Sequence, residues 1–288
     1  MLTCVDRIQL VVADRDEAAA TFGRLLGAER VREGGSRLQN AHVTTLQAGD
    51  SEIDLLEAAG DGPVAEFAAK WREGLYGVGF STPDVDALAR HFDGFHVPYE
   101  REKERLVIHG HAGHGLPVVV SPGAERTRVG PLRHIYEVTN PVPDAKATTA
   151  LYAAAFGLDE SRFCAIRSEL YGYEGSLTLF DPPAKLDRIE VTQTWGGMAM
   201  DRFFQRRGAG LYMCYAEVDD VPALAERLRS HGARFTDSED RPPETGLFIH
   251  PASLHGMLMG ISRTDYAWVW SGHPELAGAG AAESYRAH

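Results

Sequence analysis

The chain has 288 residues, of which 44% are hydrophobic and 24% are charged, and its formal net charge is −12. These values are ordinary for a globular protein, and the length allows one large domain or two of average size. The negative charge, with no basic cluster to offset it, argues against nucleic acid or an anionic membrane as a partner. The N-terminus lacks a signal-peptide pattern, and no apolar run approaches the roughly 18–20 residues of a membrane span.

The three cysteines, Cys4, Cys164 and Cys214, lie far apart in the chain. An odd number at such spacing argues against a disulfide framework and against a thiolate zinc site. We therefore expect small buried side chains in a protein of the reducing cytoplasm.

Strands followed by helices are expected at four places along the chain. These places are residues 5–27, 75–92, 132–157 and 211–232. Within the last of them, Val221, Leu224, Ala225 and Leu228 have the spacing of one helix face. Acidic residues that can cap helices lie at or near the four expected starts, at Asp14, Asp84, Asp144 and Asp219.

Short apolar runs of strand type follow each expected helix. Examples are HVTTLQA at 42–48, EIDLLEA at 52–58, GSLTLFD at 175–181 and RIEVTQT at 188–194. Glycine, proline and acidic turns separate these runs. The repeating order is therefore a strand, a helix and then about three strands.

An internal repeat organises the whole sequence. Residues 53–92 align without a gap with residues 189–228, and the similarity continues further along both halves. We therefore expect an N-terminal domain at 1–126 and a C-terminal domain at 127–270, followed by an Ala/Gly-rich tail at 271–288. The predicted fold class is α+β, with four βαβββ modules paired into two cupped sheets whose outer faces carry the helices.

The fourfold βαβββ order resembles the vicinal oxygen chelate superfamily, which contains glyoxalases, bleomycin-resistance proteins and extradiol dioxygenases. The C-terminal half is most similar to the methylmalonyl-CoA epimerase family. Two stretches carry this likeness, FFQRRGAGLYMCYAEVDDVPALAERLRSHGARF at 203–235 and GLFIHPASLHGMLMG at 246–260. The resemblance covers nearly the whole chain and implies the glyoxalase/dioxygenase type of fold; it does not specify one reaction.

The resemblance also implies a divalent metal ion in a cup, held by the first and last strands of paired modules. In the C-terminal half these positions fall on His134, Glu190, Met213 and Gly260, and in the N-terminal half on Arg7, Asp54, Gly77 and Val119. Only three of the eight could serve as ligands, His134 and Glu190 together and Asp54 alone. The site is thus degenerate, and the N-terminal half is expected to be vestigial.

Three interpretations of His134 and Glu190 remain open. They could hold one divalent ion, Fe, Mn, Co, Ni or Zn; they could act without a metal, with Glu190 orienting His134 as a general base; or they could be ordinary core residues. Tyr136 lies two residues after His134, and Met213 and Tyr215 are spaced in the same way. Residues two apart share a strand face, so these three side chains are expected to bind substrate.

A repeated histidine pattern, I-H-x-x-x-x-H-G, occurs at 108–115 and 249–256. In the first copy His109, His111 and His114 crowd together, which is compatible with metal binding. In the resembling family this stretch is a turn rather than the ligand set. We therefore expect these histidines to stabilise a turn.

These observations predict a cytoplasmic enzyme that acts on a small molecule in the C-terminal cup, of isomerase, lyase or dioxygenase type. The alternative is a non-catalytic protein that binds or sequesters a small molecule, as the bleomycin-resistance type does. Neither nucleic acid nor a membrane is an expected partner. A homodimer remains possible, since related cups are also built across chains.

Overall fold

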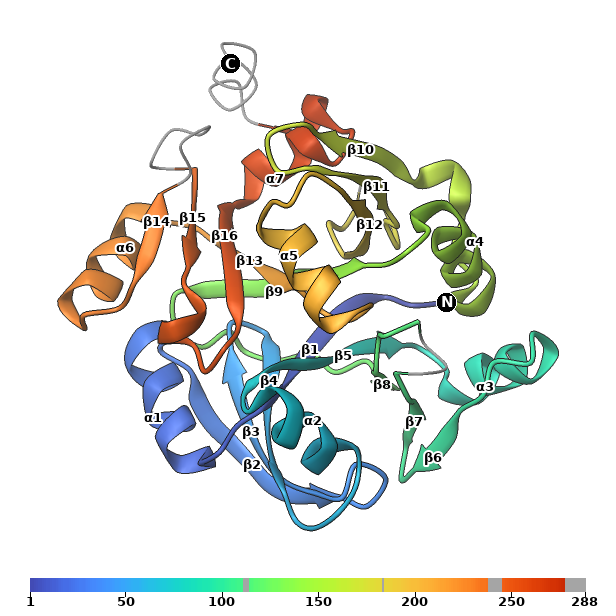
Figure 1. Cartoon of the computed structure of the whole chain (residues 1–288), viewed down its shortest axis with the longest axis horizontal. Coiled ribbons are helices and arrows are strands. Elements are labelled where there is room, and N and C mark those ends of the chain that lie inside the picture. The colour runs from blue at the N-terminus through green and yellow to red at the C-terminus, as the bar shows by residue number, and fades with distance from the viewer. Residues whose placement is uncertain (111–113, 183, 238–244, 278–288) are drawn as a thin grey trace. The chain divides into compact units, whose positions relative to one another are not determined.

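The protein folds as four βαβββ modules, as predicted from the repeat. The structure, a computed structural model, describes residues 1–110, 114–182, 184–237 and 245–277 (Figure 1). The first module consists of β1 (Cys4–Val11), α1 (Arg15–Leu26), β2 (Glu29–Ser36), β3 (Ala41–Ala48) and β4 (Ser51–Ala58), followed by α2 (Pro63–Trp71). The second consists of β5 (Gly74–Thr82), α3 (Val85–Gly94), β6 (Glu100–Glu102), β7 (Arg105–Ile108) and β8 (Val118–Pro122).

The second half of the chain repeats this order. The third module consists of β9 (Leu132–Pro141), α4 (Ala145–Phe156), β10 (Cys164–Ser168), β11 (Tyr173–Leu177) and β12 (Arg188–Thr194), followed by α5 (Ala199–Arg207). The fourth consists of β13 (Met213–Val218), α6 (Val221–Ser230), β14 (Phe235–Asp237), β15 (Gly246–Ile249) and β16 (Leu258–Arg263), followed by α7 (Thr264–Trp270). Short 3-10 turns lie at Glu160–Arg162, Pro251–Ser253 and Pro274–Leu276.

The strands form two eight-stranded curled sheets. Their orders are β2-β3-β4-β1-β5-β8-β7-β6 and β10-β11-β12-β9-β13-β16-β15-β14. In every module the first strand pairs in parallel with the last, and the other pairings within the module are antiparallel. The first and last strands of each module therefore lie side by side, and their side chains can meet.

Asp14, Asp84 and Asp144 cap α1, α3 and α4 as expected, because each carboxylate accepts backbone N–H groups of the first turn. At α6 the cap is Asp220, which accepts from Ala223 N–H. The neighbouring Asp219 instead pairs with two arginines, Arg128 and Arg133.

The two faces of the inner strands differ in side-chain type. In β4, Ile53 and Leu55 are fully buried, whereas the alternate positions Glu52 and Asp54 carry charge. Strand β12 follows the same rule, with Ile189 and Val191 on one face. Since α1 packs on β3 and β4, and α4 on β11 and β12, the charged residues lie on the face opposite these helices.

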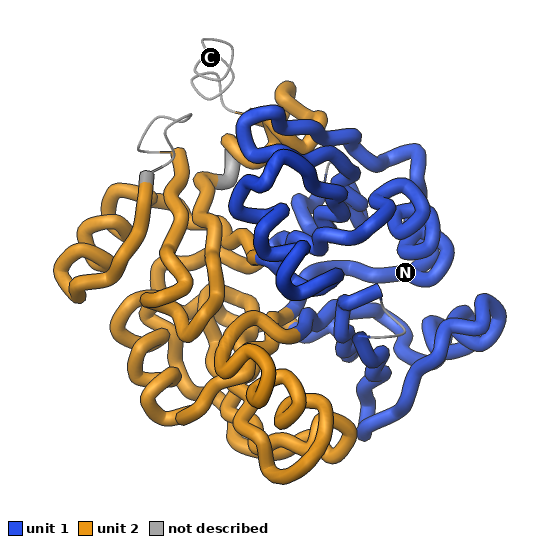
Figure 2. Tube along the Cα trace, in the orientation of Figure 1, with its two compact units in different colours: residues 1–6, 77–124, 136–212 blue, residues 7–76, 125–135, 213–288 orange. Residues whose placement is uncertain are grey.

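Close contacts divide the chain into two compact units (Figure 2). Unit 1 contains residues 1–6, 77–124 and 136–212, and unit 2 contains the remaining residues, 7–76, 125–135 and 213–288. This division differs from a split of the chain into sequential halves, although each sheet is built from one half of the sequence. The domain boundaries expected from the repeat stay a prediction, and tail residues 278–288 lie outside the described part of the chain.

The repeated His–Gly pairs form turns. His114 and His255 have φ of 51° and 48°, and the glycines that follow them have φ of 86° and 83°. At Gly256 a Cβ atom would lie 2.8 Å from the carbonyl oxygen of Glu73, so a larger residue does not fit this turn. His109 pairs with Glu100 at 2.8 Å. His111 lies outside the described residues.

None of the described helices is long and apolar enough to cross a membrane.

Candidate functional site

The strand register shows which residues of the two halves occupy equivalent positions. In the first sheet Arg7 of β1 lies opposite Glu52 of β4. In the second sheet the corresponding pair is Glu137 of β9 and Arg188 of β12. Because the sequence repeat already matches Glu52 to Arg188, the residue equivalent to Arg7 is Glu137, three residues after His134.

A cluster of charged side chains fills this position in unit 1. We call Glu137, Thr139, Arg188 and Glu190 the acid cluster. The Arg188 Nε donates to Glu137 Oε2 at 2.5 Å, and the Thr139 hydroxyl donates to Glu190 Oε2 at 2.5 Å. The negative charge of Glu137 also opposes ionisation of the nearby Glu190 carboxyl group.

The electrostatics of the acid cluster favour the protonated form of Glu190. Burial, then the charge of Glu137, raises the pKa of Glu190 to about 8, while Thr139 and Arg188 oppose the shift. The exposed fractions are 6% for Glu190, 2% for Glu137 and 0% for Arg188. The raised pKa favours the neutral form of Glu190, which is also the member of the cluster with the most contact to solvent.

Aromatic and sulfur groups surround the acid cluster. The Arg188 guanidinium lies 4.8 Å from the centre of the Tyr136 ring, a cation–π contact. Burial raises the pKa of Tyr212, and the charge of Glu190 adds to the shift. Burial likewise raises the pKa of the half-buried Cys164 thiol, against an opposing effect of Arg188. The site thus combines a neutral acid, a fixed cation and hydroxyl groups.

The equivalent cluster in unit 2 has more cations. Arg7 pairs with Glu52 at 2.7 Å and with Asp54 at 3.4 Å. Glu52 also meets Arg32 at 3.0 Å and Arg126 at 3.4 Å. Three guanidinium groups therefore compensate two carboxylates, an arrangement typical of a structural ion-pair network.

The residues predicted from sequence fall into both units. Glu190 and Tyr136 lie in unit 1 and share the contact with Arg188. His134 lies in unit 2, where its Nδ1 is 3.6 Å from Glu217 Oε2, and it is 27% exposed. Glu137 and Thr139, which contact Glu190, are odd-numbered positions of β9, so His134 has the opposite strand phase.

Met213 and Tyr215 are buried in unit 2. The Tyr215 ring packs near Phe248 and Trp270, with ring centres 5.9 Å and 6.5 Å away. It also lies directly over Gly260, where a Cβ atom would be 2.2 Å from Tyr215 Cε1. The ring therefore occupies the space that an acidic side chain at position 260 would need.

The described residues do not fit a divalent metal ion. They contain no group of three or more His, Cys, Asp or Glu side chains arranged to hold one. At the expected positions Arg188 places a fixed positive charge beside Glu190, Gly260 has no donor, and Met213 offers only a soft thioether. We therefore derive no chemical step through a metal.

Comparison with family models gives the class of the protein. Residues 6–106 and residues 134–259 each match a model described as the Glyoxalase/Bleomycin resistance protein/Dioxygenase superfamily. These matches cover most of the chain, so the protein belongs to this superfamily. A comparison with curated protein sequences finds no match.

Among solved structures, a variant of 4-hydroxymandelate synthase from Streptomyces coelicolor has the same fold, with a TM-score of 0.68 and 15% identity over 100% of this chain and 99% of that chain. Methylmalonyl-CoA epimerase from Streptomyces coelicolor matches with 25% identity and a TM-score of 0.39, over 43% of this chain and 100% of that chain. Methylmalonyl-CoA epimerase from Mycobacterium tuberculosis matches with 21% identity and a TM-score of 0.39, over 43% of this chain and 90% of that chain.

Besides Thr139, two charged residues of the acid cluster, Glu137 and Arg188, were not among the candidates from sequence. Both lie within ordinary strand patterns, where a charged residue at an alternate position suggests solvent exposure. One signal was available. Extending the gapless repeat by one residue pairs Arg188 with Glu52, two charged residues at equivalent strand positions, but Glu137 follows only once the strand pairing is known.

Proposed function

We propose that the protein is a small-molecule enzyme that transfers protons at the acid cluster, of isomerase or lyase type, without a divalent metal. The observation that carries this proposal is the pair of buried carboxyl groups, Glu137 and Glu190, beside the single guanidinium of Arg188. One cation balances one carboxylate, so the second carboxyl keeps its proton at neutral pH.

A neutral carboxylic acid suits a substrate with a carbonyl group and an acidic neighbouring C–H bond. The Glu190 O–H can donate to the carbonyl oxygen and stabilise the negative charge that develops when the C–H proton leaves. A pKa of about 8 also allows Glu190 to exchange protons readily near neutral pH. Thr139 keeps the carboxyl group in one orientation through its hydrogen bond.

The first experiment measures the proton itself, so it needs no substrate. Infrared spectra of the whole protein at about pH 7 should show a band from a protonated carboxyl group, because Glu190 is expected to be neutral at this pH. Glu190→Gln should remove the band, and Asp54→Asn, at the equivalent position of the first sheet, should keep it. A wild-type spectrum without this band would overturn the proposal.

The second experiment measures catalysis. The protein is incubated in D2O with α-keto acids, α-hydroxy ketones and acyl thioesters, and exchange at the carbon beside the carbonyl is followed by proton NMR. We expect exchange with at least one class, roughly 100–10,000-fold slower for Glu190→Gln and unaffected by EDTA. Glu160→Gln, at an exposed glutamate of the same unit, should not change the rate.

The same assay separates the two proposed partners of Glu190. If the acid cluster carries the chemistry, Glu137→Gln should slow exchange strongly and His134→Ala should have little effect. The opposite result would favour the His134–Glu190 pair expected from sequence.

The second candidate function is a binding protein without catalysis. The observation that favours it is the low exposure of the cluster, 6% for Glu190 and 2% for Glu137, which leaves little surface for a reacting substrate. Such a protein should bind its ligand in Glu190→Gln as tightly as in the wild type, and should lose affinity in Tyr136→Ala or Tyr215→Ala. It should show no exchange with any carbonyl compound.

A further inference from the structure

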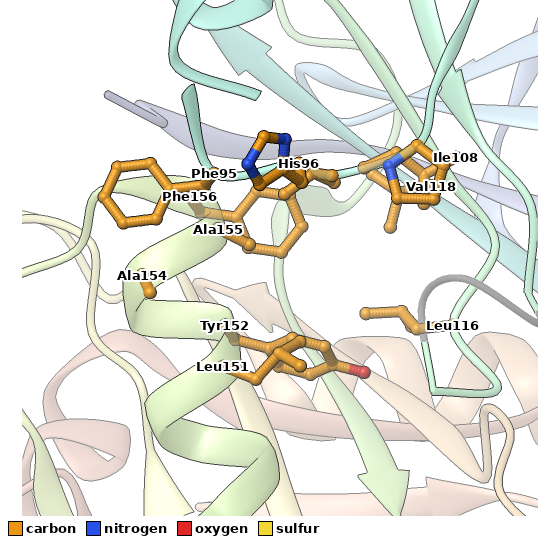
Figure 3. A pocket seen from close by; sticks show the side chains of 12 residues that line it. Phe95, His96, Ile108, Leu116, Val118, Leu151, Tyr152, Ala154, Ala155 and Phe156 are labelled. Atoms are coloured by element: carbon orange, nitrogen blue, oxygen red, sulfur yellow. The ribbon is translucent and has the colours of Figure 1, made fainter. Parts of the chain in front are cut away.

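Unit 1 contains an apolar pocket that shares no residue with the acid cluster. Its volume is about 340 Å³. The turn after α3, the last turns of α4 and the residues Ile108, Leu116 and Val118 line it. The side chains of Leu151 and Tyr152 lie across an open space from Ile108 and Val118 (Figure 3). The volume is within the usual range of about 300–1,000 Å³ for small-molecule sites.

Aromatic packing holds one wall of this pocket in place. The Phe156 ring has its centre 5.7 Å from that of Phe80 and 6.1 Å from that of Phe92. Tyr152 packs against Phe156 at 5.9 Å, and its hydroxyl donates to Asn140 Oδ1 at 2.7 Å. These contacts fix the positions of the rings that form the wall.

Large apolar side chains flank the pocket at its surface. Phe95 is 55% exposed and Leu151 is 39% exposed. Two exposed apolar groups beside an apolar hollow leave a continuous hydrophobic area in water, which a bound apolar molecule would cover. This area is therefore suited to ligand contact.

The lining residues define the chemistry of the ligand. None of the twelve carries an Asp, Glu, Lys or Arg side chain, so a charged ligand would lose hydration without gaining an ion pair. His96 and Tyr152 are the two polar members. His96 has a positive φ of 54°, and its backbone N–H donates to the backbone carbonyl oxygen of Asp93 at 3.3 Å. This hydrogen bond fixes the turn that carries the imidazole.

We propose that this pocket binds a neutral aromatic small molecule, at a site separate from the acid cluster. The Phe95, Tyr152 and Phe156 rings would pack against the aromatic ligand, and the His96 imidazole would form a hydrogen bond with one polar substituent. The site does not depend on the proposed proton-transfer activity.

The test uses 1-naphthol, a neutral two-ring compound with one hydroxyl group, titrated into the full-length protein by calorimetry and by ligand-observed NMR. Leu151→Asp places a carboxylate at the pocket and should weaken binding roughly tenfold or more. Leu170→Asp is the matched control, since Leu170 is also exposed in unit 1, at 55%, and does not line the pocket. It should leave the affinity unchanged.

Two further measurements make the result decisive. Phe95→Asp, at a second exposed lining residue, should weaken 1-naphthol binding as Leu151→Asp does. The charged analogue 1-naphthoate should bind roughly tenfold or more weakly than 1-naphthol. The proposal is overturned if the wild type does not bind 1-naphthol up to its solubility limit, if the pocket variants bind as well as the control, or if naphthoate binds equally well.

Discussion

The charged clusters of the two sheets occupy equivalent strand positions with their charges exchanged. In the first sheet the arginine, Arg7, is on the first strand of the module, and the acids are on the last strand. In the second sheet the first strand supplies Glu137, and the last strand supplies Arg188 together with Glu190. The same backbone positions thus hold ion pairs of opposite polarity.

The number of cations is the difference that matters. Glu52 has Arg7, Arg32 and Arg126 within 4 Å, so the first cluster is fully compensated by guanidinium groups. The second cluster has the guanidinium of Arg188 for both carboxyl groups. One cluster can serve as a structural network, whereas the other retains a titratable proton.

A second exchange concerns side-chain size. In the first sheet Gly79 lies opposite Val119, and in the second sheet Tyr215 lies opposite Gly260. The glycine is therefore on the first strand in one sheet and on the last strand in the other. In both sheets this pairing therefore joins a glycine to a larger residue, so two large side chains never meet there.

The largest expected effect is that of Arg188→Met. It leaves two buried carboxyl groups without their shared cation and should lower the free energy of unfolding by about 3–5 kcal/mol at pH 7, measured by chemical denaturation. Arg7→Met should cost less, because Glu52 keeps Arg32 and Arg126. Equal losses in the two variants would contradict the difference in charge balance.

Glu190→Gln should change the pH dependence of stability. The pKa of Glu190 is raised from 4.5 in the unfolded chain to about 8, so the folded state holds a proton that the unfolded state releases. Wild-type stability should therefore fall as pH rises through this range, by roughly 4 kcal/mol between about pH 5 and pH 9, and the variant should lack this loss. Thermal unfolding at about pH 5, 7 and 9 measures this change in stability. The control Asp54→Asn should keep the pH-dependent loss seen in the wild type.

Gly260→Ala should destabilise the protein by about 1–3 kcal/mol, because the new methyl group meets the Tyr215 ring. In a Tyr215→Leu background the same substitution should cost much less. At the equivalent position of the first sheet, Val119→Ala should destabilise for the opposite reason, since it removes buried atoms. A double-mutant cycle for residues 215 and 260 with no coupling energy would refute the contact.

The smallest expected effect is that of Arg32→Met. This side chain is 47% exposed, and Glu52 retains two other guanidinium partners. We expect a loss of less than about 1 kcal/mol in chemical denaturation, decreasing further at high salt. A larger loss would show that the first cluster depends on all three cations.

The fold was predictable from sequence because its signals are local and repeated. Helix caps such as Asp14 and Asp84, the helical spacing and the gapless alignment of 53–92 with 189–228 together determine four similar modules. Each signal agrees with the others, so a prediction based on any one of them is corrected by the rest.

The acid cluster could not be located in the same way. The sequence comparison matched Arg7 of β1 to His134 of β9, but the strand pairing matches Arg7 to Glu137, three residues further along β9. A shift of three residues is odd, and an odd shift in a strand moves the side chain to the other face. The pairing with Arg188, which settles the count, is a contact between strands far apart in sequence.

The contact of Tyr215 with Gly260 has a consequence for evolution. An acid introduced at position 260 would collide with the ring, and a smaller residue at 215 alone would leave a cavity beside Phe248 and Trp270. Each single substitution lowers stability, and only the two together are compatible. A chain that acquires an acid at position 260 must therefore change position 215 as well, and either change made first should lower stability.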